Sequence, residues 1–219
     1  MFLHCPPKEI HDLKTENINN KRHYVTPNGK YASITTILGS FNKQWLFDWR
    51  KRVGEEEATR ISTRASSRGT KTHSLCEQYL KNETIDYNDI ANTVSLDCFI
   101  SIKPFLDNIN NIHQLECALY SDRLKVAGRC DAIAEYDGVL SIIDYKTSSR
   151  LKSEEDIQDY FLQATFYAMA YYELTGIKIN QIVIIIAVED DFSQIFVKNI
   201  NSYIQTLISK IKCYHSKNS

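Results

Sequence analysis

The sequence has no excess of charge of either sign, and this limits the classes of protein to which it can belong. Its 26 Lys and Arg residues nearly balance its 27 Asp and Glu residues, which gives a formal net charge of −1. A protein that coats nucleic acid by electrostatic attraction alone needs a basic excess, so this class is disfavoured. Near-neutral charge remains compatible with acidic groups that cluster in one place and basic groups that cluster in another.

Several other features are absent. The six cysteines contain no C-x-x-C pair, which disfavours a zinc ribbon. The longest apolar run, Ile182–Val188, is too short to cross a membrane. The N-terminus has neither a secretory signal nor the Arg-rich pattern of a mitochondrial transit peptide, and no G-x-x-x-x-G-K-[ST] loop indicates a helicase motor. We therefore expect an intracellular, cytoplasmic protein with reduced thiols.

The first half of the chain is predicted to be mainly helical. A length of 219 residues suits one well-packed domain, with room for an extra helical part. Residues 1–30 are polar and predict an irregular lead-in that ends in a turn at Asn28-Gly29. Ser33 is a suitable N-cap for a short helix. Further helical periodicity predicts helices over the ranges 41–64, 69–81 and 93–112.

The second half has a different pattern, which predicts strands. Short apolar or alternating runs and an Asp137-Gly138 turn indicate three antiparallel strands. A helix that ends at Gly176, a fully apolar strand, a partner strand and a closing helix follow. These later elements are predicted over residues 154–174, 181–188, 194–197 and 202–214, after strands over 115–121, 126–136 and 140–145. The order predicts an α/β protein with a central mixed sheet flanked by helices and an N-terminal helical layer.

Three charged residues lie on the first strands of this second half. Side chains alternate across a strand, so Asp144 and Lys146 share one face, and Asp131 on the preceding strand is within reach. Two carboxylates can hold a hard divalent cation, which polarises a phosphate and activates water. A lysine can orient or deprotonate that water, or stabilise the developing negative charge. The alternative is a simple Asp144–Lys146 ion pair without catalytic meaning.

This constellation resembles the catalytic pattern of the PD-(D/E)XK nuclease superfamily, in its RecB-like branch. Asp131 and Asp144-Tyr145-Lys146 carry the core motif, Gly69 to His73 resembles G-x-x-x-H, and Gln163 to Tyr167 resembles Q-x-x-x-Y. Within that branch, the chain resembles the mitochondrial genome maintenance exonucleases and their phage relatives, and the likeness extends from residue 33 to residue 188. The resemblance implies a PD-(D/E)XK core over residues 113–219. Residues 31–112 would roof the site and supply His73.

The resemblance also implies roles for individual residues. His73, Asp131, Asp144 and the backbone carbonyl of Tyr145 would bind Mg²⁺ or Mn²⁺, for which a neutral imidazole is an acceptable ligand. Without the motif context, a lone helical histidine would more often be a packed or surface residue. The other members of the implied catalytic set are Lys146, Glu116, Gln163 and Tyr167. Glu116 would be a direct metal ligand or would hold a bound water, and Gln163 and Tyr167 share a helix face.

Candidate DNA contacts follow from position and charge. Arg64, Arg68 and Lys71 precede His73 and could line a channel, and a second group, Thr147, Ser148 and Arg150, follows Lys146 and could hold a phosphate. Trp45 and Trp49 could stack on bases. Their helical spacing favours core packing instead.

The predicted function is a metal-dependent DNA exonuclease that acts on free ends of single-stranded DNA, in a DNA repair or replication setting. The alternatives are a flap or junction endonuclease of the same superfamily and a non-catalytic DNA-binding module. DNA is the expected partner, with room for replication or recombination proteins, and a phage-encoded protein would act in the host cytoplasm. No membrane and no nucleotide cofactor are expected. Some RecB-like nucleases hold an iron–sulfur cluster on a cysteine triplet near the C-terminus, but Cys213 stands alone there, so no cluster is expected.

Overall fold

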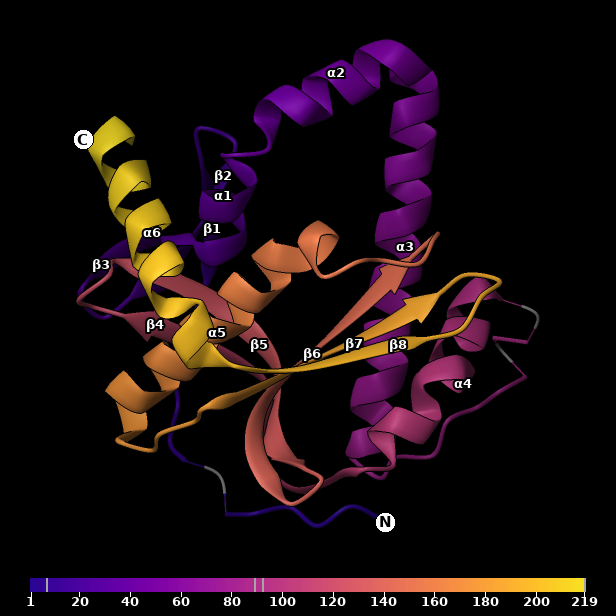
Figure 1. Cartoon of the computed structure of the whole chain (residues 1–219). Helices are drawn as coiled ribbons and strands as arrows, with labels where there is room; N and C mark the ends of the chain where they lie inside the picture. The colour runs from indigo at the N-terminus through magenta and orange to yellow at the C-terminus, as the bar shows by residue number, and fades with distance from the viewer. Residues whose placement is uncertain (7, 89, 92, 219) are drawn as a thin grey trace.

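The computed structural model describes residues 1–6, 8–88, 90–91 and 93–218. An eight-stranded mixed sheet lies at its centre, with helices on both faces, as predicted (Figure 1). The strands are β1 (Thr15–Ile18), β2 (Lys21–Thr26), β3 (Gly29–Ser33), β4 (Ile109–Ser121), β5 (Val126–Tyr136), β6 (Val139–Ser148), β7 (Gln181–Val188) and β8 (Gln194–Asn199). The helices are α1 (Ile34–Gly39), α2 (Lys43–Val53), α3 (Glu55–Leu80), α4 (Val94–Leu106), α5 (Gln158–Thr175) and α6 (Ile204–Asn218), with 3₁₀ turns at Glu155–Ile157 and Ile200–Ser202.

The N-terminal segment is less irregular than predicted. The lead-in of residues 1–30 contains β1, β2 and the start of β3, although the turn at Asn28-Gly29 is confirmed between β2 and β3. β3 pairs in parallel with β5, with Ala32 opposite Val126. These short polar strands are therefore stabilised by a partner about 90 residues further along the chain, which no local pattern can reveal.

The helical layer differs from the prediction at its breaks. Ser33 caps α1 as predicted, accepting a hydrogen bond from the Thr36 amide at 3.0 Å. The predicted helix over 41–64 is instead interrupted at Gly54, whose φ of 90° suits glycine. Beyond Gly54, α3 continues without a break to Leu80, so Gly69 lies in the middle of a helix rather than at a helix start. The end of the predicted helix over 93–112 is the first part of β4.

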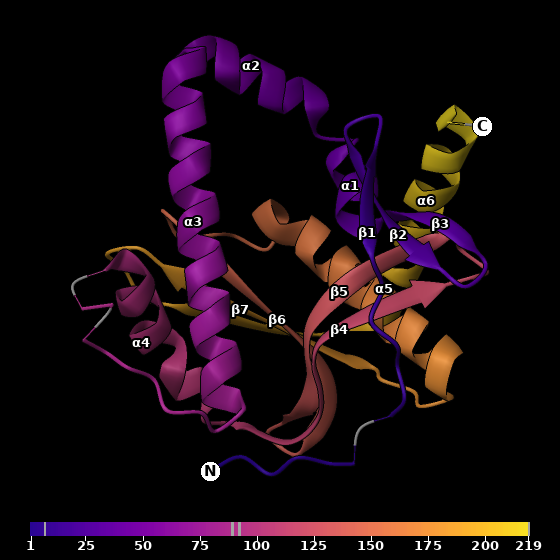
Figure 2. The same ribbon diagram turned by 180° about the vertical axis from the view of Figure 1, so that it is seen from behind.

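Trp45 and Trp49 on α2 do not pack in the core, which corrects the preferred interpretation of their spacing. Trp45 is 66% exposed, and none of the described side chains of α2 is buried. Both ribbon views place α2 at a distance from the sheet, between α1 and the upper end of α3 (Figures 1 and 2). Helical periodicity was a correct sign of a helix, but the helix has no core to cover.

The predictions for the second half are confirmed more closely. β4, β5 and β6 form an antiparallel set, and β7 matches its predicted range. β6 and β7 are parallel, and the connection between them contains α5. After its first residue, Gln181, β7 is apolar and buried because helices cover both faces of the sheet.

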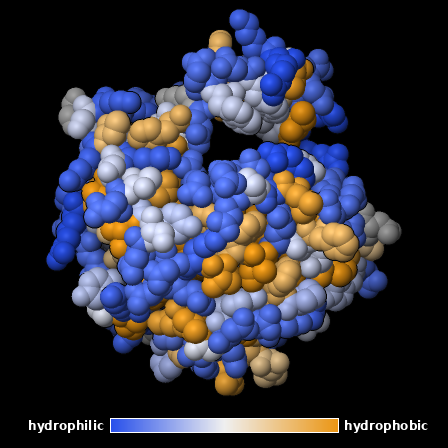
Figure 3. Space-filling view, in the orientation of Figure 1, coloured by the Kyte–Doolittle hydropathy of each residue, from blue (hydrophilic) through white to orange (hydrophobic). Residues whose placement is uncertain are grey.

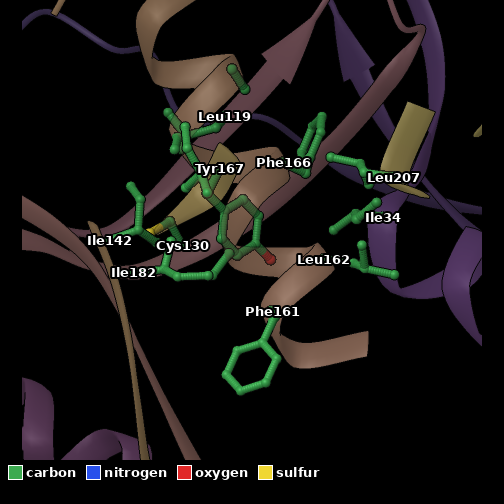
Figure 4. Close-up of a cluster of buried hydrophobic side chains, with 14 of the residues drawn as sticks. Ile34, Leu119, Cys130, Ile142, Phe161, Leu162, Phe166, Tyr167, Ile182 and Leu207 are labelled. Atoms are coloured by element: carbon green, nitrogen blue, oxygen red, sulfur yellow. The ribbon is translucent and has the colours of Figure 1, made fainter. Parts of the chain in front are cut away.

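Two apolar clusters lie on opposite faces of the sheet. One joins α1, α5 and α6 to the strands, and the other joins α3 and α4 to them. Figure 4 shows the first cluster around the ring of Tyr167, close to Ile34 and Cys130. A Cβ atom added to Gly128 would meet Tyr167 Cε1 at 2.8 Å and Ile34 Cγ2 at 3.0 Å. Only glycine therefore lets β5 pass this closely beneath α1 and α5.

β5 changes its neighbour in the middle, and this change creates the space for the site. Its first residues pair with β3 at Val126 and Ala127, and its second part pairs with β6 from Ala132 onward. Within the described ladders, residues 128–131 have no strand partner on this edge. We refer to this place, where β3 and β6 separate along β5, as the fork.

Two further observations concern the whole chain. All six cysteines are free. No helix in the described ranges combines the length and the apolar character needed to cross a membrane.

Candidate active site

The fork brings Asp131 next to the backbone of β6. The register of β5 and β6 places Asp131 opposite Asp144, one position beyond the last pair, Ala132 and Ile143. Instead of continuing the ladder, the Tyr145 amide donates a hydrogen bond to Asp131 Oδ2 at 2.8 Å. The Asp131 carboxylate thus takes the place of a backbone carbonyl as the acceptor for this amide, and the hydrogen bond orients the carboxylate.

Asp144 lies at the centre of a second set of contacts, made with α5. It is fully buried, and its Oδ2 accepts from the ammonium group of Lys146. Its Oδ1 accepts from Gln163 Nε2 at 3.2 Å, and Gln163 also donates to the Tyr167 hydroxyl at 3.0 Å. Each oxygen of this buried carboxylate therefore has a donor, as a buried charge requires. The Nζ atom of Lys146 lies 5.2 Å from the centre of the Tyr160 ring.

Glu116 and His73 join Asp131 on its other side. The register of β4 and β5 places Glu116 opposite Asp131, between the pairs Leu115–Ala132 and Cys117–Cys130. His73, delivered by α3, has its Nδ1 atom 3.5 Å from Asp131 Oδ2. One ligand atom from each of His73, Glu116 and Asp131 lies within 4.8 Å of the other two.

This donor set suits a divalent cation. Carboxylate oxygens are the preferred ligands of Mg²⁺ and Mn²⁺, and an imidazole nitrogen is acceptable to Mn²⁺. Glu116 also has a φ of 48°, in the left-handed region that non-glycine residues rarely occupy. Strain of this kind persists only where surrounding structure enforces it, and it is frequent at functional sites.

The carboxylates affect one another's protonation. Burial and the adjacent charge of Asp131 raise the pKa of Glu116 to about 7. Burial likewise raises the pKa of Asp144 to about 6. Burial alone would lower the pKa of Lys146, but the charges of Asp144 and Asp131 and the hydrogen bond to Asp144 together outweigh burial, and the pKa is raised. The pKa of His73 is also raised, because the charge of Asp131 and its contact with the ring, together with the charge of Asp144, outweigh burial. Shifted pKa values that gather in one cluster are typical of functional sites.

A pocket of about 680 Å³ opens beside these groups. Its walls come from β2, α1, α3, β4, β5, β6 and α5, and they include His73, Glu116, Asp131, Lys146 and Gln163. Side chains from the two faces of the sheet meet here because the fork interrupts the sheet.

The predicted metal ligands are thus gathered at one place. The group with metal-ligand spacing contains Glu116 in addition to His73 and Asp131. Asp144, also predicted as a ligand, accepts hydrogen bonds from Lys146 and Gln163. The Tyr145 carbonyl, also predicted as a ligand, lies 3.4 Å from Lys146 Nζ. The ion-pair alternative and the catalytic interpretation are therefore compatible, because Lys146 both pairs with Asp144 and lines the pocket.

The candidate DNA contacts on α3 lie elsewhere. Arg64 and Arg68 both form ion pairs with Glu189, and the side chain of Arg68 is only 7% exposed. Arg68 and His73 are five residues apart, so about 140° of helix rotation separates their side chains. Lys71 is exposed and does not line the pocket. The positive charge predicted for this stretch is therefore partly neutralised by an acidic residue at the end of β7.

The candidates after Lys146 lie at the end of β6. Thr147 is half-buried, with its hydroxyl 3.7 Å from where a Cβ on Gly69 would stand. Ser148 donates to the Arg150 carbonyl at 2.6 Å, and the Arg150 guanidinium pairs with Asp156 at 3.0 Å. These contacts shape the turn that leads to α5.

Two basic residues of the pocket wall were missed by sequence reasoning. Arg22 on β2 donates to Thr35 Oγ1 at 3.0 Å, and Arg129 on β5 pairs with Asp12. Arg129 stands two residues before Asp131 and could have been suspected. Arg22 lies in a segment that was predicted to be irregular, so no local signal pointed to it.

Comparison with known proteins agrees with this geometry. The family model described as the PD-(D/E)XK nuclease superfamily matches residues 106–189, the segment that contains β4 to β7 and α5. Over these residues the chain therefore matches the core of that superfamily. The PD-(D/E)XK core thus begins within three residues of β4 and ends one residue after β7.

Curated relatives extend the similarity beyond that core. The chain is 29% identical over 143 residues to mitochondrial genome maintenance exonuclease 1 of Homo sapiens, which covers 61% of this chain and 39% of the relative. With the protein of the same name from Xenopus tropicalis it shares 26% identity over 175 residues, or 74% of this chain and 50% of the relative. The matched part thus spans half or less of the length of these relatives.

A solved structure shares the fold. A protein from Eubacterium rectale, described as a candidate exonuclease, superposes with a TM-score of 0.50 at 16% identity. The match covers 70% of this chain and 65% of the other. At this identity the likeness concerns the arrangement of the PD-(D/E)XK core with its flanking helices.

Proposed function

We propose that the protein is a metal-dependent deoxyribonuclease that removes nucleotides from free ends of single-stranded DNA. The observation that carries the proposal is the convergence of Glu116, Asp131 and His73 with Lys146 in one pocket of a PD-(D/E)XK core. The exonuclease names of its relatives support an exonuclease in preference to other nucleases of the superfamily.

The chain's own residues have separate tasks in this proposal. His73, Glu116 and Asp131 would hold Mg²⁺ or Mn²⁺, with Asp131 oriented by the Tyr145 amide. The bound cation would polarise the scissile phosphate and acidify the attacking water. Lys146, kept as an ammonium by Asp144, stabilises negative charge that develops on the phosphate.

Gln163 and Tyr167 act as positioning residues. The Gln163 amide holds Asp144, and the Tyr167 hydroxyl accepts from the same amide, so α5 fixes the carboxylate that holds Lys146. Such support from packed groups is what keeps a reactive lysine in place to within a fraction of an ångström.

The requirement for a free end is supported by the surroundings of the pocket. In the space-filling view an opening lies between α2 with the upper part of α3 and the body of the molecule (Figure 3). α1 and α3, which carry α2, both line the pocket. A substrate that must pass beneath α2 has to be threaded, and a closed circle has no end to thread.

The deciding experiment compares linear and covalently closed circular single-stranded DNA of the same sequence, with Mg²⁺. We expect release of mononucleotides or short products from the linear strand and a circle that stays intact. Degradation of the circle at a comparable rate would favour a flap or junction endonuclease of the same superfamily. Lack of hydrolysis of either substrate, with DNA still bound, would favour a non-catalytic DNA-binding module.

A further inference from the structure

α2 exposes large apolar side chains to solvent. Trp45 is 66% exposed, Phe47 62% and Leu46 43%. Figures 1 and 2 show α2 held away from the sheet at both of its ends by α1 and α3. Concentrated exposure of this kind is unusual on a monomeric protein and generally marks a surface that binds something.

The arrangement of these side chains is ordered. The rings of Trp45 and Trp49 are parallel to within 5°, with centroids 6.4 Å apart. Positions i, i+4 and i+7 share one side of a helix, so Arg52 continues the stripe that the two indoles begin. Phe47 and Lys51 form a second, adjacent pair with the same spacing. Lys51 and Arg52 have no ion-pair partner within the described part of the chain.

Charge indicates what kind of molecule covers this surface. The sequence of α2 contains four basic residues and one acidic residue, in a chain whose net charge is −1. A second copy docking through the same helix would bring two positively charged helices together, which is unfavourable. An unpaired nucleic-acid strand carries both planar bases for the indoles and phosphates for the cations.

We infer that α2 is a base-stacking site, where unpaired bases of the substrate strand stack on Trp45 and Trp49 and phosphates contact Lys51 and Arg52. The inference rests on the proposed function for the identity of the substrate. It adds that the protein recognises the bases themselves, and not only the backbone, as the strand passes beneath α2 toward the pocket.

The chain offers a direct reporter, because Trp45 and Trp49 are its only two tryptophans. Oligothymidylate and an abasic tetrahydrofuran oligomer of equal length and charge are titrated into the protein, with Ca²⁺ in place of Mg²⁺ to limit cleavage. We expect oligothymidylate to quench tryptophan fluorescence and to bind at least about tenfold more tightly than the abasic oligomer, as each stacked base contributes strongly.

Variants separate base stacking from purely electrostatic binding. Binding to each variant is measured by the anisotropy of labelled oligomers. Trp45→Ala/Trp49→Ala should weaken oligothymidylate binding to the abasic level, whereas Trp45→Phe/Trp49→Phe should retain most of it. Phe192→Ala is the matched control, because Phe192 is 85% exposed and lies beside Asp190 and Asp191, which repel DNA. Because α2 contributes no described side chain to the core, the substitutions should leave the circular dichroism spectrum unchanged.

Equal affinity for the two oligomers, or binding of oligothymidylate without quenching, would overturn the inference. So would self-association of the wild type that the double alanine variant abolishes, which would identify a second copy as the occupant. If base-dependent binding is found but linear DNA is not hydrolysed with Mg²⁺, the proposed function fails and the stacking site stands. If linear DNA is hydrolysed but binding does not depend on the bases, the stacking site fails and the proposed function stands.

Discussion

The strands of the fork and α2 are opposites in burial, although both are assigned to the same substrate. β5 and β6 hold Asp131 and Asp144 among fully buried apolar residues, whereas α2 has no buried side chain among those described. Groups that polarise a phosphate need fixed positions and little water, which a packed sheet provides. A surface that accommodates successive bases of any sequence can be exposed and adaptable.

The sharpest test of this division is removal of the cation. If the chemistry depends on the donor set of the fork, excess EDTA should abolish hydrolysis of end-labelled linear DNA, and Mg²⁺ or Mn²⁺ should restore it. Ca²⁺ should support little cleavage, because its looser coordination acidifies water weakly. Robust hydrolysis in excess chelator would refute the catalytic role of His73, Glu116 and Asp131.

The next largest effect should come from Lys146. Lys146→Ala should lower turnover by roughly 10²–10³-fold while DNA affinity stays close to the wild-type value, because α2 and the cation site remain. Lys178→Ala, which removes an exposed lysine before β7, is the control and should be without effect. Combination of Lys146→Ala with Asp131→Ala should cost far less than the product of the two losses. Near-normal turnover of Lys146→Ala would contradict the role of this side chain.

Alanine substitutions at Gly128 and Gly69 compare the tight packing at the fork with a looser position on α3. A Cβ at Gly128 would stand 2.8 Å from Tyr167 and 3.0 Å from Ile34, so Gly128→Ala should destabilise the protein by about 1–3 kcal/mol. A Cβ at Gly69 would meet only Thr147 at 3.7 Å. Gly69→Ala should therefore be neutral or stabilising, by up to about 1 kcal/mol, because alanine favours the helix. Urea denaturation measures both, and similar costs at the two positions would count against this account of the fork.

The smallest effect concerns Glu116 and pH. Its pKa of about 7 exceeds the ordinary value of 4.5, so the folded state retains the proton longer than the unfolded state. Ionisation of Glu116 therefore reduces stability as the pH rises from 4.5 to 7, and the full cost persists above pH 7. In metal-free buffer at pH 8, Glu116→Gln should raise Tm by roughly 2–4 °C.

The difference in Tm between Glu116→Gln and the wild type is controlled by measuring it at several pH values and with Mg²⁺. The gain in Tm should shrink as the pH falls toward 5, where the wild-type carboxyl is protonated in the folded state. Excess Mg²⁺ should reverse the order, because only the wild type offers the third ligand. A gain that is independent of pH would indicate relief of backbone strain or altered packing instead of charge.

The sequence by itself determined most of the PD-(D/E)XK core. The β7 range, the helix that ends before Gly176 and the pairing of Asp144 with Lys146 all follow from patterns within a few residues. Strand alternation, a turn at Asp137-Gly138 and an uninterrupted apolar run are local signals, and buried strands obey them closely. His73 was found through a motif, because no periodicity distinguishes a ligand from any other helical histidine.

Only the tertiary structure decided which charges remain available and which surfaces are covered. Arg68, a predicted DNA contact, forms an ion pair with Glu189, more than 100 positions away. The sequence left open whether Glu116 is a direct ligand, and the register of β4, which places it opposite Asp131, gives it the spacing of one. Trp45 has the spacing of a core residue but lies on a helix that extends beyond the core. In each case the deciding interaction joins residues far apart in the chain or depends on how far the core extends, and a local pattern contains no information about either.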